Sequence, residues 1–452
     1  MFKNHAVAFS LAAFIIAAFI LTAPLPAQTQ DKKSQHQPSP RMPPAPSGAF
    51  VLRGGKLLTI THGVIENGVL VIQNGKITAL GPAVSTAVPA GAKVIDVTGM
   101  TVYPGLIDSE THLGLTEISA DMMTDDQLEN SDEIMPHMHV YDAFHAETAL
   151  IPVTRVNGIT NAIVSPAIGD TLPGQDSFIQ LAGRSATEML MVRDIALPLN
   201  FTGRQRRNES FERAKFPQTR MGMAAQLRQA FLDAQDYEQK LAEFEKKKSS
   251  DKPGNPPKKD LKLEALLPYM RGQRPVVLAA EEPNDVETAL DLANEFHLKV
   301  ILNHITHSAS LLDKIAATGF PVIVGPIYDQ PKESERYDAV FKLPAALVKH
   351  GIKIAFASYD AHQACNLPYA AGYAVAFGLP YEEALKAITL NPAQIWGVDQ
   401  QLGSLDVGKM ANVVVANGDP LDVKTDVKHV FIGGEEIPLV NKQTELRDRY
   451  WQ

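Results

Sequence analysis

The feature that most constrains the fold is an alternation of short apolar runs and helical stretches between Pro104 and Gln400. The runs are rich in valine, isoleucine and alanine, while stretches such as 285–296 and 381–388 have helical periodicity. Strands that alternate with helices favour a parallel sheet covered by helices and, over this length, a barrel. We therefore expect an α/β protein built on a parallel β/α barrel. The expected strands lie within residues 104–114, 158–164, 275–279, 299–304, 321–324 and 353–357.

The first of these runs ends in two polar side chains. Glu110 and His112 are two residues apart, and alternate residues of a strand point to the same side. A carboxylate and an imidazole side by side can bind a divalent metal ion. We therefore expect both side chains to face one site at the end of the strand.

Short β-branched runs separated by glycine turns lie on both sides of the central segment. They occupy residues 50–102 and recur at residues 411–416 and 427–432. Within the first group, Asn74-Gly75 is a strong hairpin signal. The two chain ends are therefore expected to be all-β.

The first 48 residues predict an exported protein. A basic start precedes a long apolar run, and Ala27 offers a cleavage site, which is the arrangement of a secretory signal peptide. Residues 28–48 are polar and proline-rich, as in a flexible linker. We expect residues 1–27 to be a signal peptide whose removal leaves no stable membrane anchor. The expected location is periplasmic or secreted.

Charge and cysteine content narrow the choice of partners. The net charge of −9 argues against nucleic acid or an anionic membrane as a partner. Cys365 is the single cysteine, so the chain has no internal disulfide and relies on its core. The expected partner is a small-molecule substrate. The sequence leaves open whether the chain forms a homo-oligomer or pairs with a homologue.

Three motifs resemble the amidohydrolase superfamily. Residues 104–108 read P-G-L-I-D and precede His112, and residues 389–393 read T-L-N-P-A. Residues 403–415 are similar to the tail G-x-L-x-x-G-K-x-A-D-x-V-V, with Asn412 where that pattern has aspartate. Further segments at 173–183 and 216–222 resemble exported bacterial proteins related to imidazolonepropionase.

This resemblance implies a (β/α)8 TIM-like barrel with a small β-sandwich domain formed by both chain ends. A stretch with helical periodicity that ends in lysines and breaker residues is read as an insertion in the barrel. The implied boundaries are residues 49–103 and 401–452 for the sandwich, 104–400 for the barrel and 220–259 for the insertion.

The same resemblance implies a metal site at the carboxyl ends of the barrel strands. Glu110 stands where the family has the first histidine of a pair, and His112 matches the second. His304 matches a sixth-strand ligand, whereas Ala279 stands where a fifth-strand ligand belongs. Asp360 matches the eighth-strand aspartate, although Tyr359 replaces the usual threonine. The set Glu110, His112, His304 and Asp360 would hold one divalent metal, zinc first, with manganese or iron as alternatives.

The expected chemistry follows from that set. Asp360 would be both a ligand and the general base that takes the proton of a metal-bound water. Substrate contacts are expected from Gln175, Arg220, His307 and His362, although an ion pair within the protein is the commoner fate of such an arginine. The histidines at 137, 139 and 145 have no metal-binding spacing and are read as loop residues.

Three functions are therefore compatible with the sequence. The first is an amidohydrolase-type, metal-dependent hydrolase of a carbon–nitrogen bond in a non-peptide or small peptide-like amide. The second is a catalytically inactive barrel that binds a ligand or assists an active homologue. The third is a metal-independent enzyme in which Asp360 and His304 form an acid/base pair.

Overall fold

The computed structural model describes residues 48–118, 121–129, 131–202, 216–217, 219–248 and 255–451. The predicted signal peptide and all but the last residue of the predicted linker lie outside these residues. Among the described residues, no helix is both long and apolar enough to cross a membrane.

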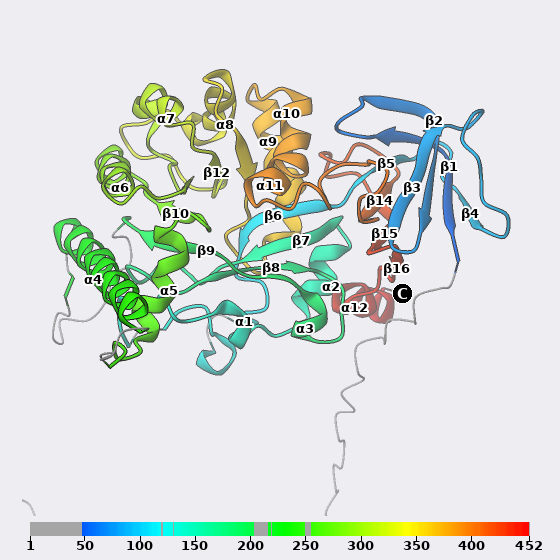
Figure 1. Ribbon diagram of the computed structural model, residues 1–452. Coiled ribbons are helices and arrows are strands. Elements are labelled where there is room, and N and C mark those ends of the chain that lie inside the picture. The colour runs from blue at the N-terminus through cyan, green and yellow to red at the C-terminus, as the bar shows by residue number, and fades with distance from the viewer. Residues whose placement is uncertain are drawn as a thin grey trace, which may run out of the picture. The chain divides into compact units, whose positions relative to one another are not determined.

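One sheet of eight strands carries the predicted barrel (Figure 1). Its strands follow one another along the sheet in chain order, so each strand lies beside its sequence neighbour. The strands are β6 (Leu106–Thr111), β7 (Ile159–Val164), β8 (Asp176–Gln180), β9 (Leu190–Asn200), β10 (Val276–Ala279), β11 (Val300–Asn303), β12 (Val322–Val324) and β13 (Ile354–Phe356). Every residue of β6, β7, β10 and β11 is buried, as expected for strands covered on both faces.

The sheet curves until its two edge strands meet. Just beyond β13, the Tyr359 N–H donates to the Glu110 carbonyl on β6 over 2.9 Å. The barrel is therefore nearly closed, and the carboxyl ends of β6, β11 and β13 lie close together.

The barrel departs from an all-parallel arrangement at β8, which is antiparallel to both β7 and β9. A parallel connection needs a crossover of a dozen or more residues, usually a helix. The segment between β7 and β8 contains no helix, and the segment after β8 contains only α3 (Ala186–Met189). The expectation of regular β/α alternation is wrong here because the chain reverses without a crossover.

Helices surround the other strands, and their bounds agree with the helices expected at residues 285–296 and 381–388. The helices not yet named are α1 (Val140–Ala143), α2 (Leu150–Arg155), α4 (Arg220–Lys247), α5 (Leu261–Met270), α6 (Pro283–Glu295), α7 (Leu312–Thr318), α8 (Ala339–Lys349), α9 (Leu367–Ala376), α10 (Tyr381–Ala387), α11 (Leu390–Ile395) and α12 (Lys442–Tyr450), with 3-10 turns η1 (Met122–Thr124), η3 (Ala309–Leu311) and η4 (Ala364–Asn366).

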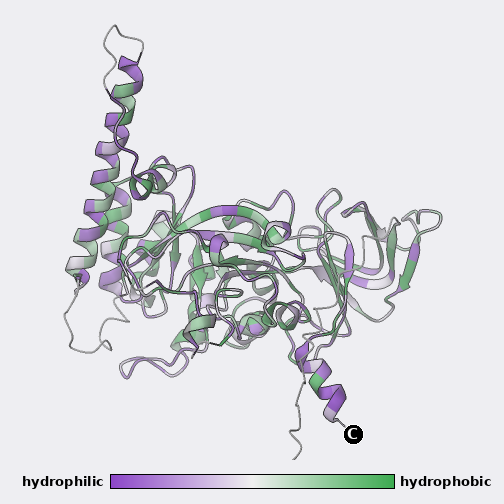
Figure 2. Cartoon of the chain, turned by 90° about the horizontal axis from the view of Figure 1, so that it is seen from below, coloured by the Kyte–Doolittle hydropathy of each residue, from purple (hydrophilic) through white to green (hydrophobic). Residues whose placement is uncertain are grey.

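Helix α4 lies in the segment predicted as an insertion. Thr219 caps its start by accepting a hydrogen bond from the Gly222 N–H over 3.1 Å. Its buried residues recur every three or four positions, and Figure 2 shows apolar and polar residues alternating along its length. The buried stripe packs against α5 and α6, as expected for an amphipathic helix on a protein surface.

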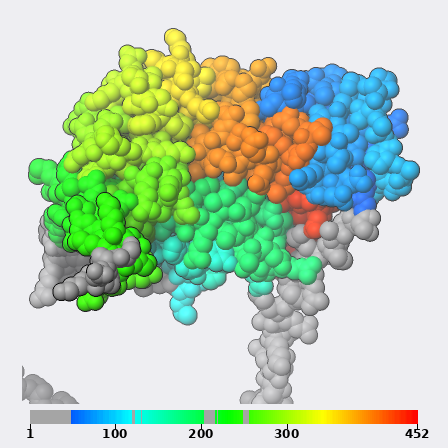
Figure 3. Space-filling view, in the orientation of Figure 1, coloured from blue at the N-terminus to red at the C-terminus, as the bar shows by residue number. Residues whose placement is uncertain are grey.

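A second sheet of eight strands combines both ends of the described chain. Strands β5 and β14 pair antiparallel, with Thr101 opposite Ala416 and Pro104 opposite Val413, and Figure 3 shows the two chain ends side by side. The implied joining of the ends is present, but as a single sheet, and a separate sandwich is not seen. Its strands are β1 (Phe50–Leu58), β2 (Val64–Gln73), β3 (Lys76–Pro82), β4 (Lys93–Asp96), β5 (Thr101–Pro104), β14 (Val413–Ala416), β15 (Val427–Ile432) and β16 (Glu435–Ile437).

The predicted hairpin is confirmed between β2 and β3. Asn74 and Gly75 have φ angles of 52° and 76°, the left-handed conformation that a two-residue hairpin turn of this kind requires.

Asn412 links this sheet to the barrel. Its amide nitrogen donates to Asn161 on β7 over 2.7 Å, and its side-chain oxygen accepts from the Gly433 N–H over 2.8 Å. Nearby, Gly105 lies so close to Thr160 that an added Cβ would come within 2.8 Å of three of its side-chain atoms. Asn412 and Gly105 therefore fix how the sheet meets the barrel.

Candidate functional site

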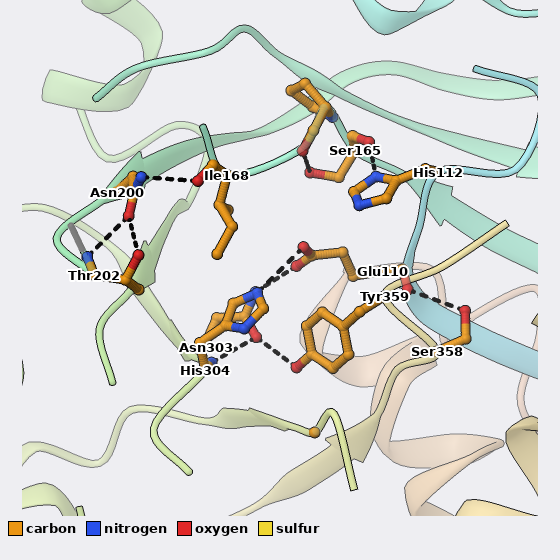
Figure 4. A network of polar contacts seen from close by, with 12 residues as sticks. Glu110, His112, Ser165, Ile168, Asn200, Thr202, Asn303, His304, Ser358 and Tyr359 are labelled. Carbon is orange, nitrogen blue, oxygen red and sulfur yellow. Dashed lines mark hydrogen bonds and ion pairs between the residues drawn. The ribbon is translucent and has the colours of Figure 1, made fainter. Parts of the chain in front are cut away.

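The carboxyl ends of β6, β11 and β13 bring a group of polar side chains together (Figure 4). Glu110 comes from the end of β6, Asn303 and His304 from the end of β11, and Tyr359 from the turn after β13. This end of a barrel is where active sites of such folds are found. We call these four residues the barrel-end group.

A chain of hydrogen bonds fixes the barrel-end group. The Asn303 side-chain N–H donates to Glu110 Oε2. The Asn303 side-chain oxygen accepts from the Tyr359 hydroxyl over 2.6 Å and from the His304 backbone N–H over 2.8 Å. Because Glu110 is only 4% exposed, its charge depends on such donors in place of water.

His304 faces the other oxygen of Glu110. Its Nε2 lies 3.6 Å from Glu110 Oε1, and its ring lies 4.4 Å from the Tyr359 ring. Within the described part of the chain, Nε2 has no hydrogen-bond partner. The backbone of His304 has a φ of 55°, an uncommon conformation that turns the residue and one that functional sites often retain.

His112 presents a ring nitrogen on the same side. Its Nδ1 lies 2.8 Å from the Ser165 carbonyl. A carbonyl only accepts, so Nδ1 carries a proton, and in the neutral ring Nε2 has a lone pair. Figure 4 shows the His112 ring on the Glu110 side of Ser165. Two histidines and one carboxylate therefore border the same end of the barrel.

Two further acids lie buried within the barrel beside Glu110. Burial raises the pKa of Asp108 to about 7, although hydrogen bonds from Ser358 partly oppose the shift. Burial, together with the charge of Glu110, raises the pKa of Asp176 well above its usual range. Both acids therefore hold protons more firmly than exposed carboxyls, which limits the negative charge around Glu110.

The side chain of Asp360 is held within its own turn. Its side chain is 50% exposed, and its Oδ1 accepts from the backbone N–H groups of His362 and Gln363 over 2.6 and 2.8 Å. Tyr359 takes the inward position, because its backbone φ of 57° turns its ring into the barrel. The position of Asp360 therefore gives no support to its predicted roles as ligand and base.

The predicted substrate-binding residues are engaged within the protein. Gln175 donates to the Pro136 carbonyl over 2.8 Å and accepts from Tyr269 over 2.5 Å. Arg220 is ion-paired with Asp285 over 2.5 Å, which is the alternative that the sequence analysis favoured.

The two remaining candidates, His307 and His362, are also held by protein groups. His362 Nε2 lies 3.2 Å from the Glu117 carbonyl. The ring nitrogens of His307 lie 3.2 Å from Glu281 and 2.7 Å from Glu335, and its side chain is 4% exposed. His307 thus connects the segments that follow β10, β11 and β12.

The donor set does not fit the metal that the family resemblance implies. Among the residues that the structure describes, no three histidine, cysteine, aspartate or glutamate side chains lie close enough together to hold a metal ion. Ala279 is at its expected place at the end of β10, without a donor atom, and Asp360 points elsewhere. The predicted set of Glu110, His112, His304 and Asp360 is therefore not assembled.

Asn303, Asp108 and Asp176 were not among the residues predicted from the sequence, and Tyr359 was expected only as a replacement for threonine. Asn303 directly precedes His304, so the strand end itself was the available signal. The two aspartates lie near the short apolar pairs Leu106-Ile107 and Phe178-Ile179, and a buried carboxyl at such a place is unusual. That contrast alone marks them as candidates.

The fold and the site together define an α/β barrel protein whose polar residues gather at the carboxyl ends of its strands. Residues 282–437 match the model of the amidohydrolase family. The solved structure of an amidohydrolase from Thermotoga maritima MSB8 has a TM-score of 0.79 and 27% identity, covering 86% of this chain and 99% of that one. The chain is therefore similar to amidohydrolases, over residues 282–437 in the family model and over most of its length in fold.

Two curated relatives add detail. Amidohydrolase tasK from Hapsidospora irregularis is 27% identical over 386 residues, which are 81% of this chain and 39% of that protein. Imidazolonepropionase from Geobacillus kaustophilus is 50% identical over 56 residues, 11% of this chain and 13% of that protein. The chain thus spans well under half the length of these relatives.

Proposed function

We propose that this chain is a hydrolase that cleaves a carbon–nitrogen bond in a small, amide-like compound at the barrel-end group. The observation that carries the proposal is the buried Glu110 carboxylate at the end of β6, with the Nε2 of His304 3.6 Å away. A carboxylate in this setting can take a proton from water. Support also comes from the similarity to two proteins named as amidohydrolases.

The substrate class is a cyclic amide, an imidazolone-like ring or a small peptide-like compound. The net charge of −9 disfavours strongly anionic polymers. The short match to imidazolonepropionase is one reason to include the imidazolone ring.

Turnover of such compounds by the purified protein tests this proposal. Products of a panel from each class would be followed by mass spectrometry for the wild type, Glu110→Gln and Asp360→Asn. We expect Glu110→Gln to lose on the order of 100-fold in kcat, while Asp360→Asn stays near the wild type. A loss in Asp360→Asn while Glu110→Gln stays near the wild type would return the role of base to Asp360.

An inactive, ligand-binding barrel is the second candidate. It is favoured by Ala279 and Tyr359, which replace two groups that the family resemblance implies for catalysis. In that case the same panel would show compounds that bind and raise the melting temperature without being turned over. Turnover abolished by Glu110→Gln would exclude it.

We also propose that the chain is exported, with residues 1–27 removed as a signal peptide. The support is the order of basic start, apolar run and small residue before the proline-rich segment. Sequencing the amino terminus of protein recovered from cell fractions tests this. An intact Met1 in cytoplasmic protein would contradict it.

A further inference from the structure

The side chain of Asn303 occupies the centre of the barrel-end group. It is buried, and its amide nitrogen donates to Glu110 Oε2. Its oxygen accepts two hydrogen bonds, from the Tyr359 hydroxyl and from the His304 N–H. All the polar atoms of this side chain thus take part in the network, which fixes which end of the amide faces Glu110.

This orientation places hydrogen atoms where a cation on Glu110 would lie. A carboxamide N–H carries partial positive charge and has no lone pair for a metal ion. A divalent cation on the lone pair of Glu110 Oε2 that Asn303 occupies would displace that donor and leave the buried Asn303 nitrogen unsatisfied. The network therefore stabilises the carboxylate in the way that a metal ion would, with a neutral group.

The neighbouring positions give no compensating ligands. Ala279 ends β10 without a donor atom, and the Tyr359 hydroxyl is committed to Asn303. Asp360 is held by two backbone N–H groups of its own turn. Ala279, Tyr359 and the turn that holds Asp360 thus each leave this end of the barrel without a further metal ligand.

We propose that the barrel-end group works without a bound metal ion, with the Asn303 amide taking the place of the cation beside Glu110. The inference rests on the proposed hydrolase function for its chemical part. Oε2 of Glu110 accepts from Asn303, so Oε1, which faces His304, is the oxygen that takes a proton.

The reaction then balances without a further reagent. Glu110 takes one proton from water as the water oxygen bonds to the amide carbon. The carbon–nitrogen bond breaks with its electron pair on nitrogen, and the proton on Glu110 passes to that nitrogen. A carboxylic acid and an amine leave, and Glu110 is again a carboxylate.

Metal retention tests the inference without any substrate. The full chain would be loaded with Zn²⁺ or Mn²⁺, dialysed, and analysed by elemental mass spectrometry beside Glu110→Gln and Asp360→Asn. We expect the three proteins to retain the same amount of each metal. About one equivalent in the wild type that is lost in Glu110→Gln would overturn the inference, whatever Asp360→Asn shows.

Metal removal during turnover separates this inference from the proposed function. If an amide is hydrolysed, we expect the rate to be unchanged by EDTA. A rate that falls in EDTA and returns with Zn²⁺ or Mn²⁺ would overturn the inference while the hydrolase function stands. If no amide is hydrolysed and the wild type retains no more metal than Glu110→Gln, the proposed hydrolase function is wrong. The inference that the barrel-end group binds no metal ion would still be supported.

Discussion

Replacing Asp108 by asparagine should remove a large part of the pH dependence of stability. The folded protein holds the Asp108 proton up to a pKa of about 7, whereas an unperturbed aspartate releases it near 3.8. Between these values the folded state binds more protons than the unfolded chain, so stability falls as pH rises. Asparagine has no proton to lose, and the variant lacks this contribution.

The structure explains why the amide is tolerated. Asp108 Oδ1 accepts from the Ser358 N–H over 2.9 Å, and Oδ2 lies 2.5 Å from Ser358 Oγ. A protonated carboxyl would donate to Ser358 Oγ, which can in turn donate to the Asp360 carbonyl 3.2 Å away. The asparagine NH₂ can replace that donor, so the variant resembles the protonated wild type.

The size of the effect follows from the two pKa values. Between pH 5 and pH 8 the wild type should lose on the order of 3 kcal/mol of unfolding free energy through Asp108. Urea unfolding at a series of pH values measures this for the wild type and for Asp108→Asn. Asp313→Asn, at a side chain that is 99% exposed, is the control and should follow the wild type. Parallel curves for the wild type and Asp108→Asn would refute the reasoning.

Three further substitutions test other parts of the structure by urea unfolding at a single pH. Tyr359→Phe removes the hydroxyl that donates to Asn303 and should cost about 1 kcal/mol of unfolding free energy. Tyr381→Phe should cost less, because its hydrogen bond to Asp419 is exposed. Equal losses of stability would contradict the role of the buried network. His307→Leu removes the imidazole that contacts both Glu281 and Glu335 and should cost about 2 kcal/mol. His145→Gln breaks an exposed pair and should cost under about 0.5 kcal/mol. A small loss at His307 would show that its contacts contribute little. Gly105→Ala should cost more than about 2 kcal/mol because the new methyl group meets Thr160. Gly48→Ala should be neutral, because an added Cβ there meets no described atom within 4 Å apart from its chain neighbours. Similar stabilities would mean that the contact at Gly105 relaxes.

Most of the barrel strands could be predicted because burial on both faces demands continuous apolar runs. The runs at 158–164 and 275–279 correspond to β7 and β10 within a residue or two. Strand β8 was not expected as a separate reversed strand. Its direction depends on the absence of a crossover helix, and no local pattern in its five residues specifies that.

The candidate site could be predicted only in part, for a related reason. Glu110 and His304 lie at strand ends, where the position of a residue along the strand determines which way its side chain points. Tyr359 and Asp360 lie beyond the strand in a turn, and the left-handed backbone at Tyr359 decides which of them faces inward. Tyrosine rarely adopts that conformation, so the sequence offered no reason to expect the exchange.

The pairing of β5 with β14 has a consequence for how this protein can be made. Some three hundred residues separate the two partners, so β5 emerges from the ribosome long before the strand that covers its edge. During that interval the early strands present unpaired N–H and C=O groups to any other extended chain. Folding of the amino-terminal strands is thus tied to the synthesis of β14, and a chain that stops before β14 would leave this edge open to aggregation.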